Sequence, residues 1–234
     1  FWGGGDILGF NTGGSSRLQI AADGGISTPT AGTSNVRLGV NAGDSITSGG
    51  NYNVLVGDEA GTALTTGDNN VAIGFEALKT EDGHGNNVAV GYQSLKTLNA
   101  GSDAFNVAVG WTSGTSLTTG NKNVLAGGAS GSSLTEGVEN TAMGTSALAA
   151  DTLGKYSVAI GRSALASQNF TSDTASNNVA VGYKAGTAVT TGTRNTIMGA
   201  VAGDALTDAD FNVVMGYGAL STDTLGSKST AVGY

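Results

Sequence analysis

The sequence predicts an all-β protein, a parallel β-solenoid (β-roll) of about twelve 17-residue coils. Two observations predict it. Glycine makes up 40 of the 234 residues, and because each glycine inside a helix costs about 1 kcal/mol, this composition disfavours helices. A five-residue element, seen as Asn87-Val88-Ala89-Val90-Gly91, also recurs along the chain. Collagen is excluded by the single proline, and a flexible linker by the 39% of hydrophobic residues in patterned clusters.

The recurring element ends on an anchor glycine, and these glycines define the coils. Eight of the eleven spacings between them equal 17 residues. Two helices need a repeat of about 33 to 47 residues, whereas 17 residues fit two short strands and two turns. Coils stacked about 4.8 Å apart predict a rod roughly 53 Å long. The anchors are Gly39, Gly57, Gly74, Gly91, Gly110, Gly127, Gly144, Gly161, Gly182, Gly199, Gly216 and Gly233.

The first half of each coil is predicted to be a strand. Alternation places Val88 and Val90 on one face and Ala89 on the other. Because both faces are apolar, we expect the strand to be buried on both sides. The thin core of so small a coil is expected to leave the alanine face in need of a second partner, and another copy of the chain is the natural one. The pattern therefore predicts a homo-oligomer and leaves its symmetry open.

The second half of each coil is predicted to be a second strand and its turns. It carries Ala-Leu or Ala-Gly three residues after the anchor, as at Ala77-Leu78, and often a leucine or valine four residues after that alanine, as at Leu64. A Thr-Thr-Gly sequence closes several coils. We expect its glycines, Gly67, Gly120 and Gly192, to supply the positive φ that tight turns need.

Asparagine recurs at the start of the repeated element, four residues before the anchor. Side-chain amides stacked at equivalent positions can hydrogen-bond from coil to coil or cap a turn, so we expect a structural ladder. Its members are Asn53, Asn70, Asn87, Asn106, Asn123, Asn140, Asn178, Asn195 and Asn212.

The chain divides into two parts. Residues 35–234 carry the repeat, which we expect to continue beyond the end of the chain. Residues 1–34 do not carry it and form an N-terminal β lead-in segment. Within this segment, residues 17–26 are predicted to form a strand, an Asp-Gly turn and a second strand.

The repeated element resembles the head repeats of trimeric autotransporter adhesins. Its longer form, Asn178 to Gly186 followed by Thr190-Thr191-Gly192, is closer to repeats of bacteriophage tail fibres. The resemblance covers residues 35–234 and implies an elongated homotrimer. The 17-residue period favours the phage type over the shorter period of the adhesin heads. The resemblance thus implies an extracellular, structural and receptor-binding segment of a virion tail fibre. The alternative is an adhesin head on a bacterial outer surface.

Composition argues against several other functions. The net charge of −8 repels phosphate backbones and anionic lipids, so no nucleic acid or membrane partner is expected. The chain has no cysteine and one histidine, His84, which disfavours a metal site, and no phosphate-binding motif is present. No catalytic residue and no cofactor are predicted, and we expect that the protein is not an enzyme.

Candidate receptor contacts come from exposed aromatics and from the irregular coils. Aromatic residues often follow the anchor and could stack on sugars, Trp111 being the strongest candidate, although a packing role is the alternative. Two coils contain 19 and 21 residues instead of 17. Extra residues in a solenoid form loops on one face, often the binding face, although neutral insertion is the alternative. The polar and aromatic candidates in these loops are Asn99, Asp103, Asn169, Phe170 and Asp173. We expect a bacterial surface glycan or protein receptor.

Overall fold

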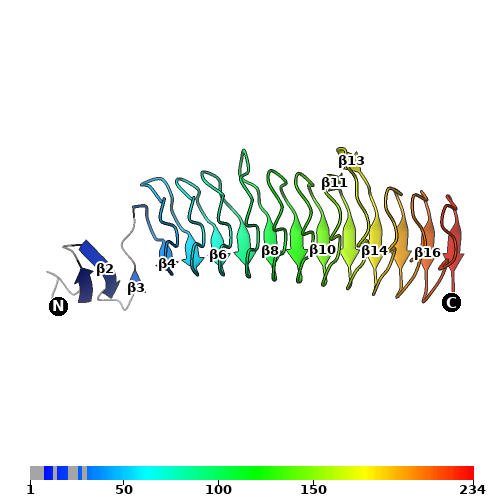
Figure 1. The fold of residues 1–234 in the computed structure, drawn as a ribbon, viewed down its shortest axis with the longest axis horizontal. Coiled ribbons are helices and arrows are strands. Elements are labelled where there is room, and N and C mark those ends of the chain that lie inside the picture. The colour runs from blue at the N-terminus through cyan, green and yellow to red at the C-terminus, as the bar shows by residue number, and fades with distance from the viewer. Residues whose placement is uncertain (1–7, 13–14, 21–25, 28–30) are drawn as a thin grey trace.

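The computed structural model describes residues 8–12, 15–20, 26–27 and 31–234. From residue 31 onward the chain winds into a rod of stacked coils with one strand from each coil along one side (Figure 1). This confirms the predicted all-β, parallel β-solenoid of about twelve coils. The described residues contain no helix long and apolar enough to cross a membrane.

One twelve-stranded parallel sheet forms the strand side of the rod, and each strand is three residues long. The register places equivalent residues of successive coils side by side, as in the pairs Val71–Val88 and Ala72–Ala89. The strands are β4 (Val36–Leu38), β5 (Val54–Val56), β6 (Val71–Ile73), β7 (Val88–Val90), β8 (Val107–Val109), β9 (Val124–Ala126), β10 (Thr141–Met143), β12 (Val158–Ile160), β14 (Val179–Val181), β15 (Thr196–Met198), β16 (Val213–Met215) and β17 (Thr230–Val232).

The sheet has an inner and an outer face, and the assignment differs from the sequence expectation. The middle residues, such as Ala72 and Ala89, point into the coil and are fully buried. Their neighbours, such as Ile73, point outward and remain partly exposed. The alanine face therefore needs no second partner, and the prediction that it packs against another copy was wrong. The larger Val and Ile side chains form the face that the chain itself leaves open.

The second half of most coils is a series of turns without a strand, so the prediction of two strands in every coil was wrong. Residues two and four positions after the anchor, such as Glu76 and Leu78, have φ of 53° and 52°. A left-handed conformation at alternate residues prevents an extended strand. The backbone is still satisfied, because these turns hydrogen-bond to the neighbouring coils, as from Leu78 N–H to the Ser94 carbonyl at 3.0 Å.

Side chains of complementary size fill the inside of each coil. Leu125 on β9 occupies the space beside Gly131, where a Cβ would lie 2.8 Å from the leucine methyl. One coil later the pair is reversed, and Ala142 on β10 is accompanied by Leu148. The choice between Ala-Gly and Ala-Leu in the sequence therefore reflects how much space the inward-facing strand residues leave in a narrow core.

The anchor glycines are required for two reasons: their backbone has positive φ, and the next coil leaves no room for a Cβ. Gly127 has a φ of 140°, and a Cβ there would lie 2.6 Å from the backbone of Gly144 in the next coil. The glycines of Thr-Thr-Gly have a different role from the predicted one. Gly67, Gly120 and Gly192 do not have positive φ. A Cβ at any of them would lie 2.2–2.4 Å from a carbonyl oxygen of the next coil, so close stacking excludes side chains there.

The asparagine ladder is confirmed, and it is buried. Asn53 accepts a hydrogen bond from Asn70 N–H through Oδ1 at 2.8 Å and donates from Nδ2 to the Gly67 carbonyl at 2.9 Å. Each such amide therefore links the first residue of the next coil's repeated element to the turn that closes the amide's own coil. Asn35 begins the ladder and was not among the predicted members; its Oδ1 accepts from Asn53 N–H at 2.8 Å.

The ladder is interrupted at Ser157, where the hydroxyl is too short to reach the next turn. Gln168 fills the gap: its Nε2 donates to Ser157 Oγ at 2.8 Å, and its Oε1 accepts from Asn178 Nδ2 at 2.8 Å. Ser176 Oγ completes the site, 2.6 Å from Ser157 Oγ. A buried glutamine thus restores the continuity that a missing asparagine would break.

The lead-in segment contains a second, antiparallel sheet. It consists of β1 (Leu8–Thr12), β2 (Ser15–Ile20) and β3 (Ile26–Ser27). Strands β2 and β3 pair through Ile20 and Ile26, which confirms the two predicted strands. The predicted Asp-Gly turn between them lies outside the described residues.

Candidate receptor-binding surface

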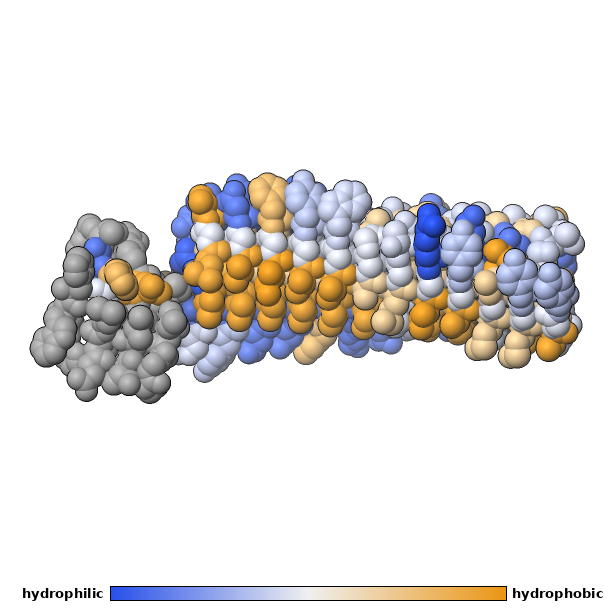
Figure 2. Space-filling model, turned by 90° about the horizontal axis from the view of Figure 1, so that it is seen from below, coloured by the Kyte–Doolittle hydropathy of each residue, from blue (hydrophilic) through white to orange (hydrophobic). Residues whose placement is uncertain are grey.

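The outer face of the twelve-stranded sheet forms a long apolar stripe along the rod (Figure 2). Each strand contributes its first and third residues, which gives 24 outward positions. All but three are apolar, the exceptions being Thr141, Thr196 and Thr230. The more open members, among them Leu38, Met143 and Val232, are 36–70% exposed. Soluble monomers rarely expose an apolar patch this long, and such patches mark interaction surfaces.

An aromatic column follows the anchor glycines, next to the apolar stripe. Phe75 and Tyr92 stack with ring centroids 5.5 Å apart, which supports the packing role weighed from the sequence. Trp111, the favoured candidate for receptor contact, is 61% exposed. Its indole is therefore open to a ligand, and its role in receptor binding stays a prediction.

The two enlarged coils rise above their neighbours on the side opposite the sheet (Figure 1). In the first, Asn99 and Asp103 are exposed. Asp103 also stabilises the loop, because its Oδ1 accepts a hydrogen bond from Gly85 N–H at 2.9 Å. The structure thus places these two candidates on one accessible loop of the rod.

The second enlarged coil contains the remaining candidates. Asp173 is exposed and pairs with Lys155 at 2.5 Å, while Asn169 is half-buried and accepts a hydrogen bond from Thr152 Oγ1. Phe170 differs from the sequence expectation, because its side chain is only 5% exposed. The ring packs into the coil and is not presented to a receptor. Strands β11 (Gly154–Lys155) and β13 (Thr174–Ala175) pair beside it.

Two buried carboxylates hold the enlarged coils, and sequence reasoning missed them. Glu81 and Asp151 occupy the position that is leucine or valine in most coils, and both are fully buried. Glu81 accepts from Ala100 N–H at 3.0 Å, and Asp151 accepts from Phe170 N–H at 3.0 Å. Each acceptor therefore stands one coil before an enlarged loop and fixes its backbone. An acid in the leucine column is the sequence signal that could have revealed them.

Burial controls the protonation of these two acids. Desolvation raises the pKa of Glu81 above its usual value, although the Ala100 and His84 N–H groups favour the ionised form. Desolvation likewise raises the pKa of Asp151, opposed first by the hydrogen bond from Gln168 Nε2 at 2.6 Å. The folded state therefore favours protons on both groups more than the unfolded chain does.

His84 belongs to the same turn as Glu81. Together with Asp82, these residues could each offer a metal ligand, and the three ligand atoms lie within 4.8 Å of one another. The Glu81 Oε1 atom is already 3.2 Å from His84 N and 3.3 Å from its Nδ1. The geometry is that of a capped turn, in which the half-buried His84 contacts the Glu81 carboxylate.

A network of opposite charges lies in the coils of β5, β6 and β7. Glu76 contacts Lys79 at 2.7 Å, Lys96 at 2.6 Å and Gln93 at 2.7 Å, and Lys79 also pairs with Glu59. The hydrogen bond from Lys79, followed by that from Lys96, lowers the pKa of Glu76 to about 2. This network ties three successive coils together.

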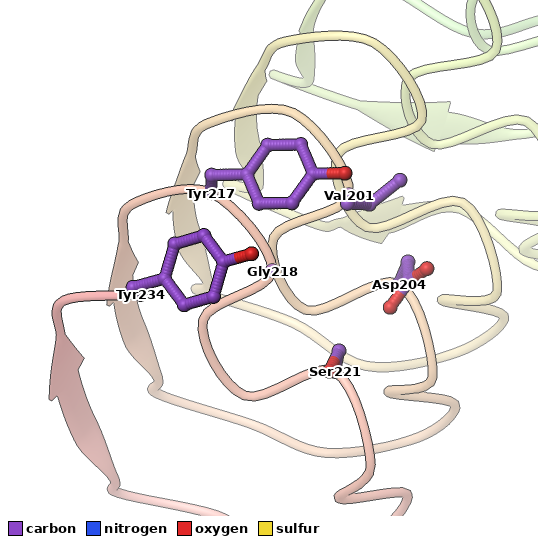
Figure 3. Close-up of a pocket in the computed structure, with 6 residues that line it drawn as sticks. All are labelled: Val201, Asp204, Tyr217, Gly218, Ser221 and Tyr234. Carbon is purple, nitrogen blue, oxygen red and sulfur yellow. The ribbon is translucent and has the colours of Figure 1, made fainter.

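An open pocket of about 450 Å³ lies in the last coils, between the aromatic column and the turn that follows it. Its lining includes the stacked rings of Tyr217 and Tyr234, with centroids 5.6 Å apart. Asp204 and Ser221 supply its polar groups (Figure 3). Asp204 Oδ1 is buried and has no hydrogen-bond partner among the described residues. The pocket thus combines an aromatic platform with an unsatisfied acceptor.

Comparison of the chain with protein-family models, with curated proteins and with solved structures finds no match.

Proposed function

We propose that the chain is a structural and receptor-binding segment of a trimeric phage tail fibre, with its copies joined through the apolar stripe. The observation that carries the proposal is the continuity of the stripe over all twelve coils, without a charged residue at any of its 24 positions. Covering this surface in water is favourable, at roughly 25 cal/mol for each Å² buried. A second copy in parallel register covers it along its whole length.

The shape of the stripe supports a closed ring of chains. Six of the twelve third strand positions carry Leu, Ile or Met, as in Ile73, Met143 and Met198, whereas the first position is always Val or Thr. The larger side chains of one chain can therefore pack against the smaller first-position side chains of the next. Such a head-to-tail contact closes by rotation around an axis parallel to the rod. Three copies are the number that the resemblance to tail fibres implies.

Both enlarged coils support a receptor-binding role. They lie on the side of the rod opposite the sheet (Figure 1), so packing through the stripe leaves Asn99, Asp103 and Asp173 exposed. Three parallel copies multiply each weak contact and raise the overall avidity. The function in this proposal is mechanical: a rigid rod that holds a tip and contacts the bacterial surface.

The test is binding of the fluorescently labelled chain to a panel of intact bacteria, with immobilised host-matrix proteins as the comparison. Saturable binding to bacterial cells supports a fibre segment. Binding only to matrix proteins contradicts it and favours the adhesin head that the sequence left as the alternative. The apolar-stripe variant Ile160→Asp is the control, because loss of assembly should also abolish avid binding.

A further inference from the structure

The pocket in the last coils lies beside a position at which one column of side chains is interrupted. In the first ten coils, the residue two positions after the anchor carries a side chain. In the eleventh coil it is Gly218, where a Cβ would meet no atom within 4 Å. The other members are Asn41, Glu59, Glu76, Gln93, Thr112, Ala129, Ser146, Ser163, Lys184 and Val201.

Two stacked tyrosines form one wall of this notch. Tyr217 and Tyr234 project from successive coils, and their planes lie 20° apart. Figure 3 shows both hydroxyls directed toward the side on which Val201 and Asp204 lie. The apolar ring faces suit the C–H face of a ring-shaped ligand, and the hydroxyls can donate and accept hydrogen bonds.

The opposite wall offers hydrogen-bond acceptors. A buried carboxylate oxygen without a donor is rare in folded proteins, which makes Asp204 Oδ1 the group that a ligand would satisfy. Ser221 adds a hydroxyl nearby in the lining. A ligand with several O–H donors matches these groups, whereas a phosphate or carboxylate would be repelled by Asp204.

We propose that this notch binds one neutral pyranose unit of a bacterial surface glycan through Tyr217, Tyr234, Asp204 and Ser221. Its volume of about 450 Å³ lies within the range of roughly 300–1,000 Å³ that small-molecule sites occupy. The inference rests on the proposed function, since it names the ligand class that a receptor-binding rod would recognise.

The chain contains an internal comparison for this site. Phe75 and Tyr92 form a similar stacked pair on the same aromatic column. Beside them, however, the notch position is occupied by Glu76 and Gln93. If a stacked aromatic pair were enough to bind sugars, both pairs would bind them. If the notch is also required, only the Tyr217–Tyr234 pair will bind.

The experiment is saturation-transfer NMR of the full chain with glucose, galactose, mannose, N-acetylglucosamine and glucosamine. We expect transfer to at least one neutral sugar, with a dissociation constant on the order of 1 mM, as is usual for weak single sites. Gly218→Gln should abolish the signal by filling the notch, whereas Ser146→Gln, which introduces the same residue in the same column, should leave it unchanged. Tyr217→Ala should weaken binding at least tenfold and Phe75→Ala should not.

Four outcomes would overturn the inference: no transfer from any sugar, equal transfer in Gly218→Gln, equal loss in Phe75→Ala, or stronger binding of glucosamine than of every neutral sugar. Cell binding separates this inference from the proposed function. Cell binding that persists with no sugar transfer rejects the notch alone. Sugar transfer without cell binding supports the notch and counts against the fibre role.

Discussion

The two faces of the twelve-stranded sheet are built from neighbouring residues but follow different rules. On the inner face, Leu125 lies against Gly131 and Ala142 is accompanied by Leu148, so large and small residues are paired inside the rod. On the outer face the residues are apolar at all but three threonine positions, and many are partly exposed, with no such matching within the chain. The inner face is therefore a core completed by the chain itself. In the proposed assembly, the outer face is completed by another copy of the chain.

The largest difference between the two faces should appear on adjacent residues of β9. Leu125→Ala removes a fully buried side chain and should lower the free energy of unfolding by about 2–5 kcal/mol. Val124→Ala, on the outer face, should lower it by about 1 kcal/mol or less per chain. Urea denaturation at one protein concentration measures both. Equal losses would mean that the two faces are packed alike.

Coil spacing can be tested separately from side-chain packing at two adjacent glycines. Gly127→Ala introduces a Cβ that overlaps the backbone of the next coil and imposes strain at a φ of 140°. We expect a loss of about 1–3 kcal/mol from the backbone conformation, and more from the overlap. Gly128→Ala is the control, because a Cβ there meets nothing within 4 Å. If thermal denaturation gives the same midpoint for both variants, the anchors are not required for stacking.

Loss of one asparagine of the buried ladder should cause a third, smaller decrease in the free energy of unfolding. Asn123→Ala leaves Asn140 N–H and the Gly137 carbonyl without their partner. The expected cost is about 1–3 kcal/mol. Asn121→Ala changes the same residue type on a partly exposed site and should cost less than about 0.5 kcal/mol. Urea denaturation distinguishes them, and a larger loss in Asn121→Ala would contradict a buried structural ladder.

The sequence predicted the periodic features of this molecule well, because a repeat reports its own geometry. The anchors, the strand that precedes each of them and the predicted ladder residues lie where the spacing placed them. The direction of the strand faces was not predictable from alternation alone, since Val88 and Ala89 are both apolar. The narrowness of the coil decides it: only a small residue fits inside opposite Leu95, so alanine points inward.

Non-periodic features were harder to predict. Phe170 was expected on the surface because it lies in an insertion, but the acceptor Asp151 holds its backbone and the ring turns inward. The notch at Gly218 arises from a side chain that is absent, in a column whose left-handed conformation already tolerates many residue types. Among so many glycines, the sequence does not reveal which one leaves an open space.

The smallest expected effect concerns pH and the buried acid beneath the first enlarged loop. The pKa of Glu81 is raised in the folded state, so its contribution to stability is fully present below the unfolded pKa of about 4 and is lost as the pH rises through the folded value. Glu76 has the opposite sign: its contribution is present above the unfolded pKa and is lost as the pH falls toward 2.

Thermal denaturation between pH 4 and 8 measures this effect. We expect the decline in stability with rising pH to be shallower in Glu81→Gln than in the unmodified chain, because the variant lacks the buried group whose pKa folding raises. Asn99→Ala, on the exposed loop above, is the control and should keep the original slope, because it removes no titratable group. An unchanged slope in Glu81→Gln would show that burial does not raise the pKa of Glu81 in the folded state.

The most direct test of the account is the mass of the chain in solution, measured by sedimentation equilibrium. If the outer face is closed by two further copies, the mass should be three times 22.9 kDa, about 69 kDa, and Ile160→Asp on that face should shift it toward a single chain. A stable species of 22.9 kDa, with the apolar stripe left in water, would contradict the central claim.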